Sequence, residues 1–157
     1  MQSESARMTT AAEGRFRVQA PNSLPRAIKV IALDPPGRAV AERLADAAWQ
    51  HATFFTALSP DGLRDLAGAP RSIDEEVATA DLIVLVAGPG GHAHAAQMIG
   101  EACSRRRVMT TGFLVGAAAA TEREVSKTLA QVRPWSLMVV IANHDDYLVD
   151  MMTALRA

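Results

Sequence analysis

Aromatic side chains, cysteine and net charge are all scarce in this sequence of 157 residues. Phe, Trp and Tyr make up 4% of the chain and apolar residues 49%, so a core must be built mainly from aliphatic side chains and Met. That composition favours an α/β protein over a β-sandwich. The only cysteine, Cys103, excludes an internal disulfide and a cysteine-built metal cluster. With 16 basic and 17 acidic side chains, the charge balance does not suggest nucleic-acid binding.

Long apolar runs are absent as well. The longest runs reach about six residues, far short of the roughly 18 that a membrane span needs. The polar stretch over residues 1–25 has no segment resembling a signal peptide. We therefore expect a flexible tail over residues 1–25, a single domain over residues 26–157, and a soluble cytoplasmic protein without membrane or nucleic-acid partners.

Short β-branched runs alternate with longer helical patterns from Arg26 onward. This alternation predicts a Rossmann-like, doubly wound α/β fold, with a mainly parallel five-stranded sheet in the order 2-1-3-4-5 and helices on both faces. The expected strands cover residues 28–33, 53–58, 81–87, 108–115 and 136–142, and the expected helices cover residues 36–50, 92–106, 118–132 and 146–157. In the 22-residue crossover 59–80 we expect a turn at Pro60 to Leu66, a short helix capped by Ser72 and Glu75, and no strand.

A glycine loop, "GPGGHAHA" at residues 88–95, follows the third expected strand. Gly88, Gly90 and Gly91 allow a ligand to approach the main chain closely, and amides at the start of a helix bind anions. Glycines at a strand-to-helix turn often serve only the turn, so this loop alone leaves phosphate binding open. The loops "DPPGR" (34–38) and "NHDD" (143–146) are expected at the same edge of the sheet, because carboxyl ends of parallel strands meet there.

Several segments in order resemble the nucleotide-binding domain of the tubulin/FtsZ superfamily, most closely that of bacterial FtsZ. They are "IKVIALDPPGRAVAERLADAAWQHATFFTA", "ADLIVLVAGPGGHAHAAQMIGEAC", "RRRVMTTGFLVG" and "SLMVVIANHDDYLVDMM", and together they span roughly residues 27–152. The resemblance implies a GTPase domain whose members polymerise head to tail and hydrolyse the nucleotide when the next subunit inserts an acidic loop. It also implies contacts to GTP or GDP with Mg²⁺ by Asp34, Gly37, Gly88, Gly90, Gly91, His92, Ala93, Asn143 and Asp145.

The chain departs from the family pattern in four places. The first loop is glycine-rich in the family, whereas here Asp34 brings a negative charge and Pro35 and Pro36 remove two amide donors. The segment "HAHA" has no hydroxyl donors, and a long insertion of the family is reduced to the 22-residue crossover. The family's central helix, catalytic acidic loop and C-terminal domain do not follow within the sequence. These departures predict a pseudo-GTPase with no catalytic residues.

Other kinds of site find less support. His92, His94 and His144 could contribute to a metal site, although histidines at a helix start diverge and more often cap the helix or face solvent. No Gly-x-Ser-x-Gly elbow is present, and only Gly37 follows the first strand where a dinucleotide fingerprint needs three glycines. Candidate interface residues, which could equally belong to the core, are Trp49, Trp135, Tyr147, Leu148, Met151, Met152 and Leu155.

Three functional hypotheses remain. The first is a non-catalytic FtsZ-like domain that acts by protein association, as a regulator, cap or accessory subunit of a complete homologue, of a larger complex or of itself. The second is a guanine-nucleotide-binding switch or weak GTPase, in which Asp34 acts through Mg²⁺ and Asn143 and Asp145 lie near the base or ribose. The third is an accessory subunit of an enzyme complex whose glycine loop binds another small anion.

Overall fold

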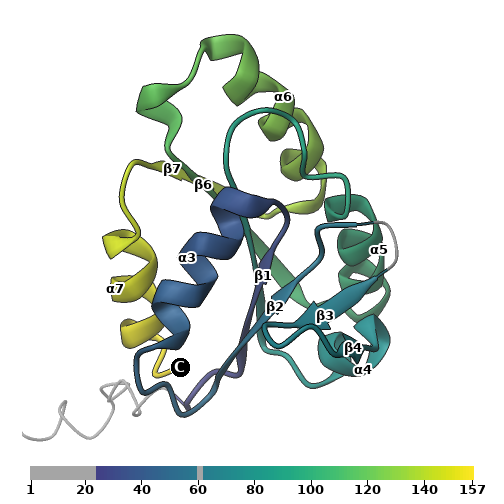
Figure 1. Ribbon diagram of the computed structural model, residues 1–157. Coiled ribbons are helices and arrows are strands. Elements are labelled where there is room, and N and C mark those ends of the chain that lie inside the picture. The colour runs from purple at the N-terminus through teal and green to yellow at the C-terminus, as the bar shows by residue number, and fades with distance from the viewer. Residues whose placement is uncertain (1–23, 60–61) are drawn as a thin grey trace, which may run out of the picture.

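The computed structural model describes residues 24–59 and 62–157, and within them one mixed sheet of seven strands (Figure 1). The strand order is β4-β3-β2-β1-β5-β6-β7. Five strands are parallel: β1 (Ile28–Ala32), β2 (Ala52–Thr56), β5 (Leu82–Ala87), β6 (Met109–Val115) and β7 (Met138–Ala142). The short strands β3 (Leu63–Asp65) and β4 (Pro70–Arg71) add to β2 in antiparallel orientation.

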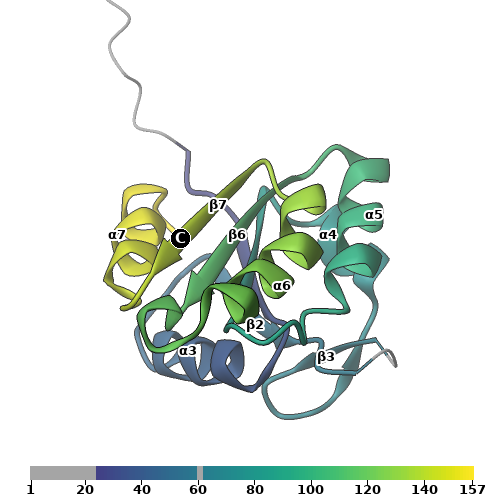
Figure 2. The ribbon, with the colours of Figure 1, turned by 90° about the horizontal axis from the view of Figure 1, so that it is seen from above.

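Helices cover both faces of the sheet (Figure 2). One face carries α3 (Pro35–Ala45) and α7 (Asp146–Ala154); the other carries α4 (Ile73–Ala78), α5 (Ala96–Arg106) and α6 (Glu122–Val132). The central strands β1 and β5 are buried at every position, as expected for parallel strands covered on two sides. The core is therefore two aliphatic layers, one on each side of β1 and β5.

The predicted α/β class is confirmed, and the five parallel strands lie in the predicted order, but the sheet has seven strands and not the five predicted. The prediction that residues 59–80 hold no strand is wrong, because β3 and β4 form a hairpin there that extends the sheet. Gly68, at φ +92°, and the Asp65 carboxylate, which accepts the Ala69 N–H at 2.9 Å, close its turn. Leu63 is the only buried residue of these two strands, so they have no apolar alternation for a sequence pattern to detect. The turn expected over residues 60–66 lies partly outside the described residues, and from Leu63 a strand takes its place.

Two helices begin four residues later than predicted. The helix expected from residue 92 begins at Ala96, and the one expected from residue 118 begins at Glu122. In the second case Thr121 and Glu124 form a reciprocal capping box, and the residues before it form the 3-10 turn η1 (Ala117–Ala119). The helix expected over 36–50 ends at Ala45, and the Trp49 indole then donates to the Leu44 carbonyl at 2.7 Å.

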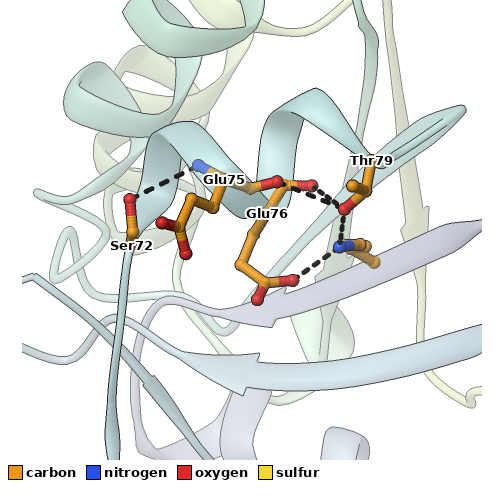
Figure 3. A network of polar contacts seen from close by, with 5 residues as sticks. Ser72, Glu75, Glu76 and Thr79 are labelled. Atoms are coloured by element: carbon orange, nitrogen blue, oxygen red, sulfur yellow. Dashed lines mark hydrogen bonds and ion pairs between the residues drawn. The ribbon is translucent and has the colours of Figure 1, made fainter.

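A buried charge connects β1 to α4. The Lys29 ammonium donates to Glu76 Oε2 and Thr79 Oγ1, each at 2.5 Å, and lies 6.0 Å from the centre of the Phe55 ring. Figure 3 shows the helix side of this network, where the Ser72 hydroxyl accepts the Glu75 N–H and caps α4; this is one half of the predicted capping box. The lysine can occupy an otherwise apolar strand because its ammonium group is paired with the Glu76 carboxylate.

The C-terminal helix completes the second layer. Leu148 and Met152 of α7 are fully buried against α3 and the sheet, and Met151 and Leu155 pack around them. None of the described helices is long and apolar enough to cross a membrane. Of the predicted N-terminal tail, residues 1–23 lie outside the described residues.

Candidate functional site

The candidate site lies where β1 and β5 end side by side. β1 is followed by Asp34 and helix α3, and β5 is followed by Gly88 and the glycine loop. Because the two strands are parallel neighbours, both loops emerge at the carboxyl edge of the sheet. This edge is where ligands bind in many open α/β sheets, so its free hydrogen-bond donors decide what it can hold.

The Asp34 carboxylate occupies the space between these two loops. Its side chain accepts the Gly37 N–H at 2.8 Å and the Gly88 N–H at 2.8 Å and 3.1 Å, and the residue is only 2% exposed. Pro35 and Pro36 fill the first two helical positions, where no partner for an N–H would exist, so Gly37 supplies the donor that the cap needs. Burial raises the pKa of Asp34, and the two amide bonds and the nearby His92 oppose that shift.

Helix α6 binds three further amides of the glycine loop. The Gly90 N–H donates to the Glu124 carbonyl at 3.1 Å. The Gly91 N–H donates to Thr128 Oγ1 at 2.9 Å, and Thr128 Oγ1 donates in turn to the Gly88 carbonyl at 3.0 Å. Ala93 N–H donates to Gln131 Oε1 at 2.8 Å, and Gln131 Nε2 donates back to the Gly91 carbonyl at 2.8 Å. The loop is thus clamped between β5 and α6, and the N–H groups of Gly88, Gly90, Gly91 and Ala93 point into the protein.

Packing and backbone shape explain why glycines stand in these loops. A Cβ on Gly37 would lie 2.2 Å from the Val86 carbonyl oxygen, and a Cβ on Gly88 would lie 2.7 Å from Cβ of Pro36. Gly90 and Gly91 adopt φ angles of +122° and +79°, which favour glycine strongly. Close approach of α3 to β5 and a tight turn therefore account for the pattern without a ligand.

No known family model and no curated protein sequence matches this chain. The contacts of the loop itself are therefore the basis for assigning its chemistry. Those contacts use a protein carboxylate, a threonine hydroxyl and a glutamine amide where a nucleotide-binding loop would offer its amides to phosphate.

The predicted base-side residues lie two strands away, after β7. Asn143 Oδ1 accepts the Ala118 N–H at 3.0 Å and joins the loop after β7 to the loop after β6. Asp145 pairs with Arg43 of α3 at 3.2 Å. The structure therefore brings Asp34, Gly37 and the glycine loop together, while Asn143 and Asp145 form separate contacts along the same edge.

The three histidines do not form one cluster in the described part of the chain. His92 and His94 are exposed at the glycine loop, with His94 Nδ1 3.1 Å from Gln131 Nε2, whereas His144 is exposed after β7. Within the described residues, no group of three or more His, Cys, Asp or Glu side chains is arranged to hold a metal ion.

The predicted interface residues divide between core and surface. Leu148 and Met152 are fully buried, so as surface contacts these two predictions are wrong, because the stripe of α7 packs on the protein's own sheet. Trp49 and Trp135 are half-buried and pack against the two core layers, and Tyr147 is exposed. Met151 and Leu155 are partly buried beside the α7 contact.

The residues of α6 that hold the loop were not predicted from the sequence. Thr128 and Gln131 bind the loop with side chains three residues apart on one side of α6, whereas Glu124 contributes its backbone carbonyl. A polar stripe beside apolar positions was the available signal, yet it is also typical of a solvent-facing helix surface. Lys29 was missed as well, although a lone charge in the run "IKVIA" indicates a buried pair.

Proposed function

We propose that this protein is a non-catalytic, FtsZ-like domain that acts by protein association, with an internal carboxylate in the place where the family that it resembles binds phosphate. The observation that carries this proposal is the position of Asp34. Its carboxylate accepts hydrogen bonds both from the Gly88 N–H and from the Gly37 N–H at the start of α3. A nucleotide-binding site at this edge would need both donors.

The order of the parallel strands supports this interpretation of the site. In a doubly wound sheet with the order 2-1-3-4-5, the ligand crevice lies between the first and third strands, where the connections turn to opposite faces. Those strands are β1 and β5 here, and the residues that follow them are Asp34 and Gly88. The position of the crevice is thus retained, and a protein side chain fills it.

Displacing the carboxylate with a phosphate is costly on two counts. Asp34 would lose two amides that stabilise it at a buried position, and an anionic ligand beside the remaining carboxylate would be repelled. The Gly90, Gly91 and Ala93 amides could turn outward only if α6 released the loop, which would leave Thr128 and Gln131 without their partners. We infer that the loop serves structure and that function lies at the protein's surface.

Calorimetric titration of the purified full chain with GTP, GDP and pyrophosphate, with and without Mg²⁺, tests this proposal. We expect no binding heat at millimolar ligand and no change in amide-hydrogen exchange over residues 88–93. Micromolar binding that is lost in Asp34→Asn would overturn the proposal in favour of a nucleotide switch that uses Asp34 through Mg²⁺. Binding of pyrophosphate without a preference for GTP would instead favour a small-anion site.

A further inference from the structure

The two edges of the sheet are built differently. At one edge, β4 has two residues, of which Pro70 has no N–H to donate and Arg71 carries a charge. Short length, proline and charge are the features with which proteins block the addition of a further strand. At the other edge, β7 is a five-residue uncharged strand with the sequence MVVIA, paired to β6 alone within the described chain.

The open edge also exposes apolar side chains. Leu137, just before β7, is 79% exposed, and Met138 and Ile141 within it are 45% and 48% exposed. Val139 and Val140 pack into the two core layers on opposite faces of the sheet. The strand is therefore anchored on both faces. Figure 2 shows β7 as the last strand of the sheet on this side, and its unpaired backbone edge is flanked by partly exposed apolar side chains.

Two hollows flank the amino end of this strand. A cavity of about 390 Å³ is lined by residues that include Arg107, Met109, Trp135 and Leu137. A second, of about 350 Å³, lies along α6 and is lined by Ser126, Leu129, Ala130, Arg133 and Pro134. The apolar surface thus continues from the strand onto the adjoining helix.

Charge is distributed unequally along the edge. The exposed Arg107 and Arg133 line the hollows at the amino end of β7, whereas the exposed Asp146 follows its carboxyl end, next to Asp145, which is already paired with Arg43. A two-fold axis normal to the sheet and beside β7 sets two copies antiparallel, so that the amino end of each strand lies beside the carboxyl end of the other. That arrangement brings the arginines of one copy toward the aspartates of its partner, so the edge is self-complementary in charge.

We propose that a second copy of this chain docks on the open edge of β7, antiparallel to it, and continues the sheet across a two-fold axis. This inference rests on the proposed function, protein association, and names the partner. Backbone hydrogen bonds between the two strands supply the centre of the contact, and the flanking surfaces of α6 and α7 supply the additional area. A standard stable interface buries about 800 Å² on each partner, which a strand pair reaches only with such flanking contacts.

Sedimentation equilibrium of the full chain tests the docking. We expect the wild-type protein to sediment as a dimer at micromolar concentration. Ile141→Lys places a charge on the open edge and should raise the dimer dissociation constant by about tenfold or more. Leu58→Lys is the matched control, because Leu58 is similarly exposed at 42% but follows β2 in the other half of the sheet. Circular dichroism must show both variants folded.

A charge exchange tests the antiparallel orientation. Arg133→Glu places two acidic ends together in its own dimer, and Asp146→Lys places two basic ends together, so each variant alone should dimerise more weakly than wild type. A chain that carries both substitutions should dimerise again, because opposite charges then meet at both ends of an antiparallel pair, whereas a parallel pair would bring like charges together. No gain in dimer for this double variant, relative to the two single variants, would overturn the antiparallel arrangement.

Two further results would overturn the docking itself. One is a wild-type chain that stays monomeric at about 100 μM. This result would overturn the docking even if a different protein binds to the same edge. The other is an Ile141→Lys variant that dimerises as wild type does. Neither result touches the proposed function, which is refuted by nucleotide binding in the separate titration.

Discussion

Replacement of Asp34 by alanine should destabilise the protein by more than the loss of a helix cap. Loss of the cap to Gly37 costs about 1–2 kcal/mol. The buried Gly88 N–H loses its acceptor as well, which costs about 1–3 kcal/mol. A charged carboxylate is costly to bury at a site that is only 2% exposed, so its removal recovers free energy that offsets part of this sum. We expect a net loss of about 2–4 kcal/mol in the free energy of unfolding.

Urea unfolding followed by circular dichroism measures this loss, with Thr121→Ala as the control. Thr121 caps α6 by accepting one amide, from Glu124 at 3.2 Å, and it is exposed, so its removal should cost only about 1 kcal/mol. Formate is a carboxylate small enough to take the vacated position. It should restore part of the stability of Asp34→Ala and leave Thr121→Ala unchanged. Equal losses in the two variants, with no selective effect of formate, would refute the role assigned to the Asp34 carboxylate.

The pH dependence of the same difference has a defined sign. Because the pKa of Asp34 is raised in the folded state by burial, its titration contributes stability below pH 3.8 that is lost as the pH rises through the folded-state pKa. The stability of wild type relative to Asp34→Asn should therefore increase as the pH falls from 7 toward 4. A relative stability that decreases over this range would show that the amide bonds outweigh burial at this carboxylate.

Three other substitutions test the packing elsewhere in the fold. Lys29→Met should cost about 2–4 kcal/mol because it leaves the Glu76 carboxylate without its buried partner, and adding Glu76→Leu should recover part of that loss, as thermal unfolding would show. Gly100→Ala should destabilise by about 1–3 kcal/mol and alter tryptophan fluorescence, because its Cβ would lie 2.5 Å from Cβ of Trp135. Leu148→Ala should cost about 2–5 kcal/mol in urea unfolding if this fully buried residue belongs to the core, whereas a surface residue would cost little.

The parallel part of the fold could be predicted because its signal is local and strong. Strands β1 and β5 are buried on both faces, so their sequences read as continuous apolar runs, and helices at regular spacing indicate the crossovers between them. The hairpin of β3 and β4 has no such signal, since it holds one buried residue and is stabilised by pairing with β2. The start of α5 was misplaced because residues 92–95 have helical composition but serve the glycine loop.

The candidate site shows why a correctly located loop can still be misjudged from sequence. The pattern of glycines is the same whether the amides face a phosphate or the protein, because it reports only close approach and unusual φ angles. What separates the two cases is the partner of each amide, and here the partners are Asp34, 54 positions from Gly88, and Thr128, 37 positions from Gly91. A carboxylate directly after the first strand is the one local sign of this outcome. Where that carboxylate is buried between the two loops, the chain itself satisfies the amides, and the glycine loop no longer implies a ligand.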